Sequence, residues 1–154
     1  MAKLPATFAR VERNTCPGAT RRIQANTRAR VGRALEEGRL EHEIDRLDAE
    51  WDTERMLETN AACLLLLSLG LGVFRDRRWL WLTGGVAAFL LQHALQGWCP
   101  PLPIIRALGV RTAREIGTER TALQALRGDF NDLGRSADAA LRAACPKCWG
   151  TGRP

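Results

Sequence analysis

The sequence predicts an all-α membrane protein in which an antiparallel transmembrane helical hairpin is flanked by amphipathic helices, and three observations lead to this fold class. Two long runs, residues 59–74 and 79–98, contain no Asp, Glu, Lys or Arg, and the second holds one histidine, His93. Only four residues, RDRR at 75–78, separate the two runs, so helices formed by them must lie side by side and run antiparallel. The segments on either side carry apolar residues at helical spacing, which is typical of amphipathic helices.

Charged residues are segregated along the chain. Residues 1–33 hold eight basic side chains and one acidic one, whereas residues 34–58 hold three basic and ten acidic ones, so the two blocks cancel. The net charge of +6 therefore comes from the link at 75–78 and from residues 99–154. An excess of arginine beside an apolar hairpin favours contact with the headgroups of the lipid bilayer, and nucleic acid is the less favoured partner.

Residues 1–37 are predicted to be a basic N-terminal arm that is partly helical. Pro17 suits the first turn of a helix, and apolar or small side chains recur about every 3.6 residues from Ile23 to Leu35. Five arginines surround this thin stripe, namely Arg21, Arg22, Arg28, Arg30 and Arg33. Two interpretations stay open, a solvated or disordered arm and a helix that lies on the membrane interface.

Residues 38–58 are predicted to form a clearer amphipathic helix. Leu40, Ile44, Leu47 and Trp51 step by four, three and four residues, which places them along one face of a helix. The other faces are acidic and are either solvated or paired with the basic arm. The seam is too short for a long coiled coil, but it suffices for a local helix pair or a dimer contact.

Residues 59–98 are predicted to be the transmembrane hairpin itself. The first run has 16 residues, about 24 Å of helix, which is slightly short for a hydrocarbon core of about 30 Å. The second run has 20 residues and is followed by Pro100 and Pro101, which cannot continue a helix. Tryptophans lie near the ends of the second run, where amphipathic rings prefer the membrane interface.

Antiparallel pairing also predicts which residues of the hairpin meet. If the residues on either side of the link face each other, Ser68 meets Gly85 and Gly70 meets Thr83. The predicted seam consists of small residues, Ser68, Gly70, Gly72, Thr83, Gly84, Gly85 and Ala88. Small side chains let helix backbones approach closely in lipid.

The same register predicts an intramembrane polar layer toward the termini, formed by Asn60, Gln92, His93 and Gln96. Ionisable residues inside a membrane are often functional. His93 is therefore either a neutral imidazole packed against Asn60 or Gln96, or a contact for a proton, a metal ion or a quinone-like ligand.

Residues 99–130 are predicted to be a post-membrane segment that contains a helix, and residues 131–154 an alanine-rich helix followed by a CPKC tail. Thr112 and Glu115 have the spacing of a capping box at a helix start. Gly128 is placed to stop that helix.

The cysteines carry the candidate chemistry. Cys99 stands where the second run ends, and a helix C-terminus does not stabilise a thiolate, so it is interpreted as structural, with persulfide acceptance from a partner as the alternative. Cys145 and Cys148 form a knuckle of the kind found in zinc-binding repeats, and they are the predicted metal ligands. Structural zinc needs four ligands, so the other two would come from a second chain or from Cys16 and Cys99. Thiol redox chemistry and an idle tail stay open for the CPKC pair.

Three motifs after the second run, GWCPPLP, LGVRT and ALRGDF, resemble the YgaP-like transmembrane domain family, a bacterial inner-membrane domain of unknown function. With the preceding helix, the resemblance covers about residues 40–130. The family motif comprises Gly97, Trp98, Cys99, Pro100 and Pro101. The resemblance implies a paired-helix domain that is often fused to, or encoded beside, sulfur-handling or redox proteins and has no accepted catalytic role.

The rhodanese domain that accompanies this family in some proteins has no counterpart in the chain, so sulfur transfer is not carried over. Together with the lack of an export signal, the resemblance predicts a multi-pass protein of the cell inner membrane, with two spans and both termini in the cytoplasm.

The predicted function is that of a small non-enzymatic membrane module that docks or oligomerises through its helices and binds zinc at its C-terminal CxxC. A second copy of the chain and a sulfur or redox protein are its expected partners besides the bilayer. The alternative is a thiol redox or sulfur-carrier membrane protein that uses Cys99 or the Cys145/Cys148 pair.

Overall fold

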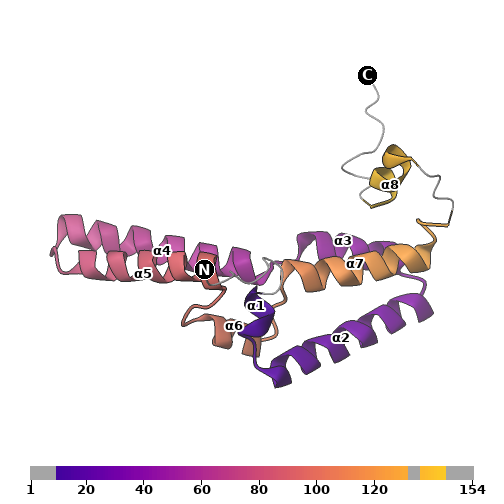
Figure 1. Cartoon of the computed structure of the whole chain (residues 1–154), viewed down its shortest axis with the longest axis horizontal. Coiled ribbons are helices and arrows are strands. Elements are labelled where there is room, and N and C mark those ends of the chain that lie inside the picture. The colour runs from indigo at the N-terminus through magenta and orange to yellow at the C-terminus, as the bar shows by residue number, and fades with distance from the viewer. Residues whose placement is uncertain (1–9, 132–135, 145–154) are drawn as a thin grey trace, which may run out of the picture. The chain divides into compact units, whose positions relative to one another are not determined.

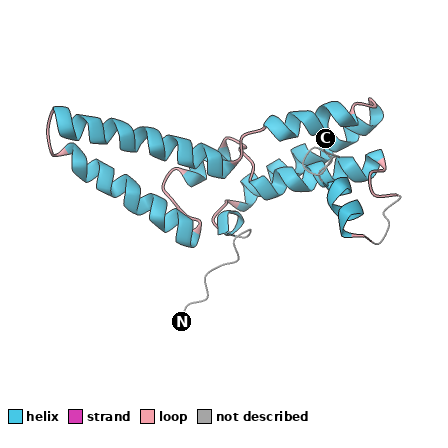
Figure 2. Cartoon of the chain, turned by 90° about the horizontal axis from the view of Figure 1, so that it is seen from above, coloured by secondary structure: helices cyan, strands magenta, loops and turns pink. Residues whose placement is uncertain are grey.

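The computed structural model describes residues 10–131 and 136–144, and within them every regular element is a helix, which confirms the predicted all-α class (Figures 1 and 2). The helices are α1 Arg10–Arg13, α2 Pro17–Glu36, α3 Leu40–Ala49, α4 Thr53–Phe74, α5 Trp79–Gln96, α6 Leu102–Ala107, α7 Ala113–Arg127 and α8 Ala137–Ala144. The chain divides into two compact units. We call Met1–Asn26 with Trp51–Glu115 the hairpin unit, and Thr27–Glu50 with Ile116–Pro154 the amphipathic unit.

Several helices begin and end at residues that the sequence marks. α2 starts at Pro17, and Gly38, with a φ of 65°, follows its end. The predicted capping box opens α7: the Thr112 amide donates to Glu115 Oε2 at 2.8 Å, and the Glu115 amide donates to Thr112 Oγ1 at 3.2 Å. Gly128, with a φ of 92°, follows α7. These positive φ angles are the conformation that glycine adopts at low cost after a helix.

The segment predicted as one amphipathic helix is broken between α3 and α4. The Asp52 side chain accepts a hydrogen bond from the Arg55 amide at 2.7 Å and so caps α4. The cap satisfies one of the backbone amides that have no acceptor at the start of a helix. Trp51 therefore leaves the predicted seam: it is 44% exposed, and its ring centre lies 4.4 Å from the Arg55 guanidinium carbon. As a result α4 has 22 residues and begins at Thr53, not at Thr59.

α4 and α5 lie side by side and run antiparallel (Figures 1 and 2). The RDRR link closes by its own hydrogen bonds. The Asp76 side chain accepts from the Arg78 amide at 2.9 Å, and the Trp79 amide donates to the Asp76 carbonyl at 3.1 Å. These hydrogen bonds fix the turn that joins the two arms of the hairpin.

The residues that meet across the hairpin differ from the simple register. Ser68 Oγ and Thr83 Oγ1 are 2.8 Å apart, so Ser68 meets Thr83 and not Gly85. A Cβ atom added to Gly72 would lie 2.6 Å from Leu80 Cδ2, whereas one added to Gly70 or Gly85 would meet nothing within 4 Å. The side chains of consecutive helical residues point about 100° apart. Counting residues away from the link therefore does not determine which of two consecutive residues faces the other arm of the hairpin.

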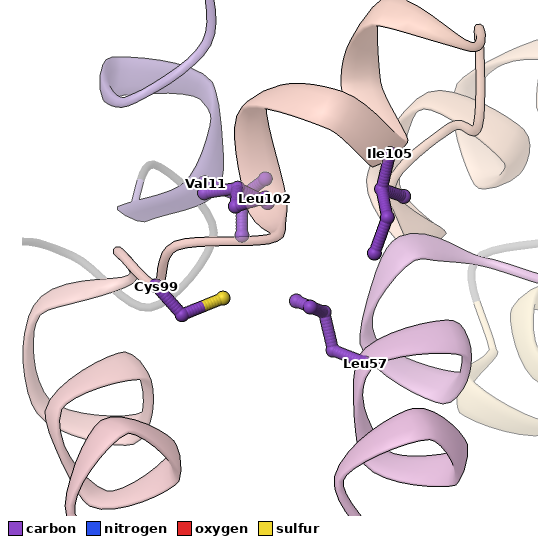
Figure 3. Packing of buried hydrophobic residues seen from close by; sticks show 5 residues of the cluster. All are labelled: Val11, Leu57, Cys99, Leu102 and Ile105. Atoms are coloured by element: carbon purple, nitrogen blue, oxygen red, sulfur yellow. The ribbon is translucent and has the colours of Figure 1, made fainter. Parts of the chain in front are cut away.

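α6 folds back against the open end of the hairpin. Pro100 and Pro101 follow the end of α5, and α6 starts directly after them. A cluster of buried side chains anchors α6 to α1 and α4: Val11, Leu57, Cys99, Leu102 and Ile105 (Figure 3). This small core holds three segments that are far apart in the sequence.

The amphipathic unit is built from α3 and the adjoining parts of α2 and α7. Its buried cluster consists of Ala34, Ile44, Leu47, Ile116 and Leu123. Glu119 is 1% exposed and accepts two hydrogen bonds from Arg30, at 3.1 and 3.0 Å. Ile44 and Leu47 of the predicted seam thus lie in this core, and Leu40 packs against it.

Within the described residues, one stretch, Leu40–Phe74, which comprises α3 and α4, is long and apolar enough to cross a membrane by length and composition. It contains α4, the first arm of the hairpin. The sequence predicts two spans. By the same criterion of length and composition, α5 is not a candidate span, so the second predicted span is not confirmed.

Candidate functional site

The hairpin unit contains a cavity of about 610 Å³ at the end of the hairpin that lies away from the RDRR link. Its walls come from α4, α5 and α6 and are mostly carbon, with side chains such as Leu64, Phe89 and Ile104. The lining side chains that carry a nitrogen, oxygen or sulfur atom are Asn60, Cys63, His93 and Cys99. An apolar cavity of this size with a few polar groups is the usual form of a small-molecule site.

The cavity exists because the two arms of the hairpin diverge. Near the link they are held close by the contact of Gly72 with Leu80 and by the hydrogen bond between Ser68 and Thr83. Figure 2 shows the arms separating from the link toward their other ends. α6 closes part of the gap, and Pro100 contributes to the wall without a backbone donor.

His93 lies between two cavities of different character. It is half-buried and lines the apolar cavity, and it also lines a smaller one of about 270 Å³ together with Glu54 and Glu58. Its backbone carbonyl accepts the Gly97 amide at 2.7 Å, the bond that ends α5. His93 therefore belongs both to the apolar cavity and to a smaller one that two glutamates also line.

Cys99 is a buried part of the small core. It is 5% exposed and packs with Leu57, Leu102 and Ile105 (Figure 3). Burial raises the pKa of the Cys99 thiol, and a hydrogen bond with the Leu102 backbone offsets only part of that effect. A thiol with a raised pKa is a weak nucleophile at neutral pH, which favours the structural interpretation of this residue.

The structure brings together two of the four residues of the predicted polar layer. Asn60 and His93 line the same cavity, and Gln92 and Gln96 do not line it. The backbone carbonyl of Gln96 instead accepts the Asn14 side-chain amide at 3.3 Å.

The predicted family motif forms the corner between α5 and α6. Gly97 adopts a φ of 75°, in the left-handed region, and caps α5. Trp98 is 37% exposed, and Cys99 is buried. Pro100 and Pro101 both line the apolar cavity, so the motif builds one wall of it.

A buried ion pair beside the small core was missed by sequence reasoning. Arg106 is 1% exposed, and its guanidinium donates two hydrogen bonds of 2.8 Å to the Glu115 carboxylate, one to Thr15 Oγ1 at 3.1 Å and one to the Val110 carbonyl at 2.7 Å. Glu115 was predicted only as a helix cap, and it also serves as the counterion of Arg106.

The ionisation of Glu115 reflects both roles. Burial alone would raise the pKa of this carboxyl, but the hydrogen bonds from Arg106 and from the Thr112 backbone, with the arginine charge, hold the pKa below its ordinary value. The carboxylate is thus charged at neutral pH. The only sequence signal for the pair is an arginine in an otherwise apolar short helix.

The predicted metal ligands Cys145 and Cys148 lie outside the described residues. Of the other cysteines, Cys16 and Cys63 are exposed and Cys99 is buried. Within residues 10–131 and 136–144 no group of three His, Cys, Asp or Glu side chains could hold a metal ion.

No protein-family model, curated protein or solved structure matches this chain significantly. The resemblance to the YgaP-like domain family therefore stays a prediction that depends on the motifs alone.

Proposed function

We propose that this chain is a small integral membrane protein of the cell inner membrane, whose α4–α5 hairpin spans the bilayer twice. The observation that carries the proposal is the exposed apolar surface of the hairpin. α5 contains no buried residue. The large apolar side chains of the hairpin that are more than 60% exposed are Leu66, Leu67, Val73, Phe74, Trp81 and Leu91. Monomeric proteins in water rarely expose so many large apolar side chains on one pair of helices.

The lengths of the two helices suit this placement. α4 has 22 residues, about 33 Å, and α5 has 18 residues, about 27 Å, at 1.5 Å per residue. α5 is close to a hydrocarbon core of about 30 Å, and the uncharged part of α4, residues 59–74, is about 24 Å long and slightly shorter than that core. The charged first turns of α4 would lie at one headgroup layer and the RDRR link at the other. A two-span hairpin with both termini in the cytoplasm follows from this arrangement and from the predicted orientation.

We infer further that the protein acts as a non-enzymatic module for docking or oligomerisation. Gly70 on α4 and Gly84 and Gly85 on α5 have open space beside them, so another helix can approach the backbone closely there. Arg106, a buried charged residue of the hairpin unit, is used with Glu115 in contacts that hold the fold. A second copy of the chain is the simplest partner for the open glycines.

Membrane placement is tested by expressing the full chain and extracting membranes with alkaline carbonate. The protein is expected to stay in the membrane and to dissolve only in detergent. Leu67→Arg places a charge on the exposed middle of α4, which costs about 3 kcal/mol in a membrane helix, and should reduce the inserted fraction. Leu126→Arg, on the 45% exposed side of α7, is the matched control and should insert normally. Release of the unmodified chain by carbonate, or equal behaviour of the two variants, contradicts the proposal.

Orientation needs a separate measurement. In inside-out vesicles the C-terminal tail of a protein with cytoplasmic termini is accessible to added protease. Protection of the tail would contradict the proposed orientation while leaving the two-span hairpin intact.

Zinc bound by Cys145 and Cys148 is proposed as a property of the tail, and the thiol redox or sulfur-carrier function is its alternative. A zinc assay on the purified full chain, combined with mass spectrometry after mild oxidation, separates the two. Stoichiometric zinc with unreactive thiols supports the zinc-binding module. A disulfide or persulfide on Cys99, Cys145 or Cys148 without zinc supports the alternative.

A further inference from the structure

The apolar cavity suits a ligand that has an apolar body and one polar head group. Most of its wall is aliphatic or aromatic, and its volume of about 610 Å³ falls in the range of small-molecule sites. The nitrogen and oxygen groups of its side chains belong to Asn60 on α4 and His93 on α5. An apolar body would therefore contact the wall while one polar group reaches the amide or the imidazole.

The charges around the cavity limit which polar group fits. Among the described side chains that line it there is no Lys, Arg, Asp or Glu. The adjoining smaller cavity, which shares His93, is lined by Glu54 and Glu58. A phosphate, sulfate or carboxylate head would lack a cation in the cavity and would approach two carboxylates, which is unfavourable in a medium of low polarity.

The amide and the imidazole suit an uncharged head. Asn60 offers both a donor and an acceptor, and the His93 imidazole does the same when it is neutral. Carbonyl and hydroxyl oxygens are the uncharged groups that such side chains bind. The wall formed by Pro100 and Pro101 adds apolar surface and no backbone donor.

We propose that the cavity between α4, α5 and α6 binds an uncharged amphiphile with a carbonyl or hydroxyl head, which enters sideways from the bilayer and places its head at Asn60 and His93. The proposal rests on the proposed membrane placement of the hairpin, because an amphiphile of this class reaches the cavity from lipid. Fatty alcohols and alkyl quinones are two sources of this head chemistry.

Cys63 provides a readout without any mutation. It lines the cavity and is exposed, and Cys16 is exposed and does not line it. The full chain in phosphatidylcholine nanodiscs is treated with N-ethylmaleimide, and modification of each cysteine is followed by peptide mass spectrometry. At a probe concentration of about ten times its Kd, the rate at Cys63 should fall about tenfold, because only the empty fraction reacts. The rate at Cys16 should not change.

Four probes separate the head from the chain. Hexadecanol and decylubiquinone should protect Cys63, and whichever protects at the lower concentration identifies the source. Hexadecane, which lacks a head, and hexadecyl sulfate, which carries a negative one, should protect at least several-fold less at the same mole fraction in lipid. Equal protection by all four would overturn the proposal, because the cavity would then take any alkyl chain.

Matched variants locate the site. Leu64 lines the cavity and Leu66 does not, although both are exposed on α4. Leu64→Trp should fill the cavity and abolish protection, whereas Leu66→Trp should leave it unchanged. Asn60→Leu removes one hydrogen-bond partner of the head and should weaken binding of hexadecanol about three- to tenfold, with hexadecane unaffected.

The two proposals fail in different ways. If the hairpin is not in the membrane, the chain will not assemble into nanodiscs, and carbonate will extract it from cell membranes. If the chain is inserted and Cys63 reacts at the same rate with and without the uncharged probes, the ligand site is refuted and the membrane hairpin stands.

Discussion

Replacing Glu115 by glutamine is expected to destabilise the hairpin unit by about 3–5 kcal/mol, the cost of removing one partner from a buried ion pair. The variant keeps the shape of the side chain and removes its charge. Arg106 is 1% exposed and donates two of its four hydrogen bonds to the Glu115 carboxylate. An arginine cannot give up its proton, so its charge would remain buried without a counterion.

Removing the other partner should cost less. In the unmodified chain the Glu115 side chain is 14% exposed and accepts the Thr112 amide. In Arg106→Met we expect water and the helix start to continue to stabilise its charge. A loss of about 1–3 kcal/mol is expected from the broken charged hydrogen bonds. The double variant should be less destabilised than the sum of the single ones, because the methionine removes the buried charge that makes Glu115→Gln costly.

The measurement is denaturant or thermal unfolding of the full chain in detergent micelles, followed by circular dichroism. Detergent micelles keep the hairpin folded while the ion pair lies outside the apolar runs. Equal effects of the two single variants, or additive effects in the double variant, would refute the argument that a buried arginine charge determines the cost.

Three further outcomes are expected. The stability of the folded state should decrease as the pH falls through the folded pKa of Glu115, because a carboxyl whose pKa is lowered on folding stabilises the folded state only while it is ionised. This pH dependence should weaken in Arg106→Met, and an unchanged pH profile would contradict the ion pair as its cause. Gly72→Leu should cost about 1–3 kcal/mol by overpacking against the second arm, whereas Gly70→Leu, which meets open space, should cost little; equal losses in detergent unfolding would contradict the observed packing. Glu119→Gln should destabilise the amphipathic unit by about 1–3 kcal/mol, and a hydrogen-exchange rate unchanged in α3 would show that its arginine pair does not hold that unit.

Helix boundaries were predictable where a residue type has one strong local preference. Pro17 and Gly128 act through their own backbone, and in the pair Thr112 and Glu115 each side chain accepts the backbone amide of the other. The break before α4 was not predicted, because the apolar period continues from Leu47 to Trp51 and conceals the cap at Asp52. There the local hydrogen bond of the cap determines the structure, and the periodic pattern does not.

The candidate site was predictable only in part. Asn60 and His93 were placed in one layer by counting residues along an antiparallel pair, and they line the same cavity. The cavity itself depends on the divergence of the two arms and on the position of α6, which are set by contacts between residues far apart in the sequence. Arg106 likewise gains its role from Thr15 and Glu115, and an isolated sequence offers no period or spacing that links them.

The double role of Glu115 has a consequence for local opening. The same carboxylate accepts the Thr112 amide at the start of α7 and holds the guanidinium that also reaches the Val110 carbonyl. Displacement of this carboxylate weakens both contacts at once. We therefore expect the first turn of α7 and the end of α6 to open together, so their amide protons should show similar free energies of opening in hydrogen exchange.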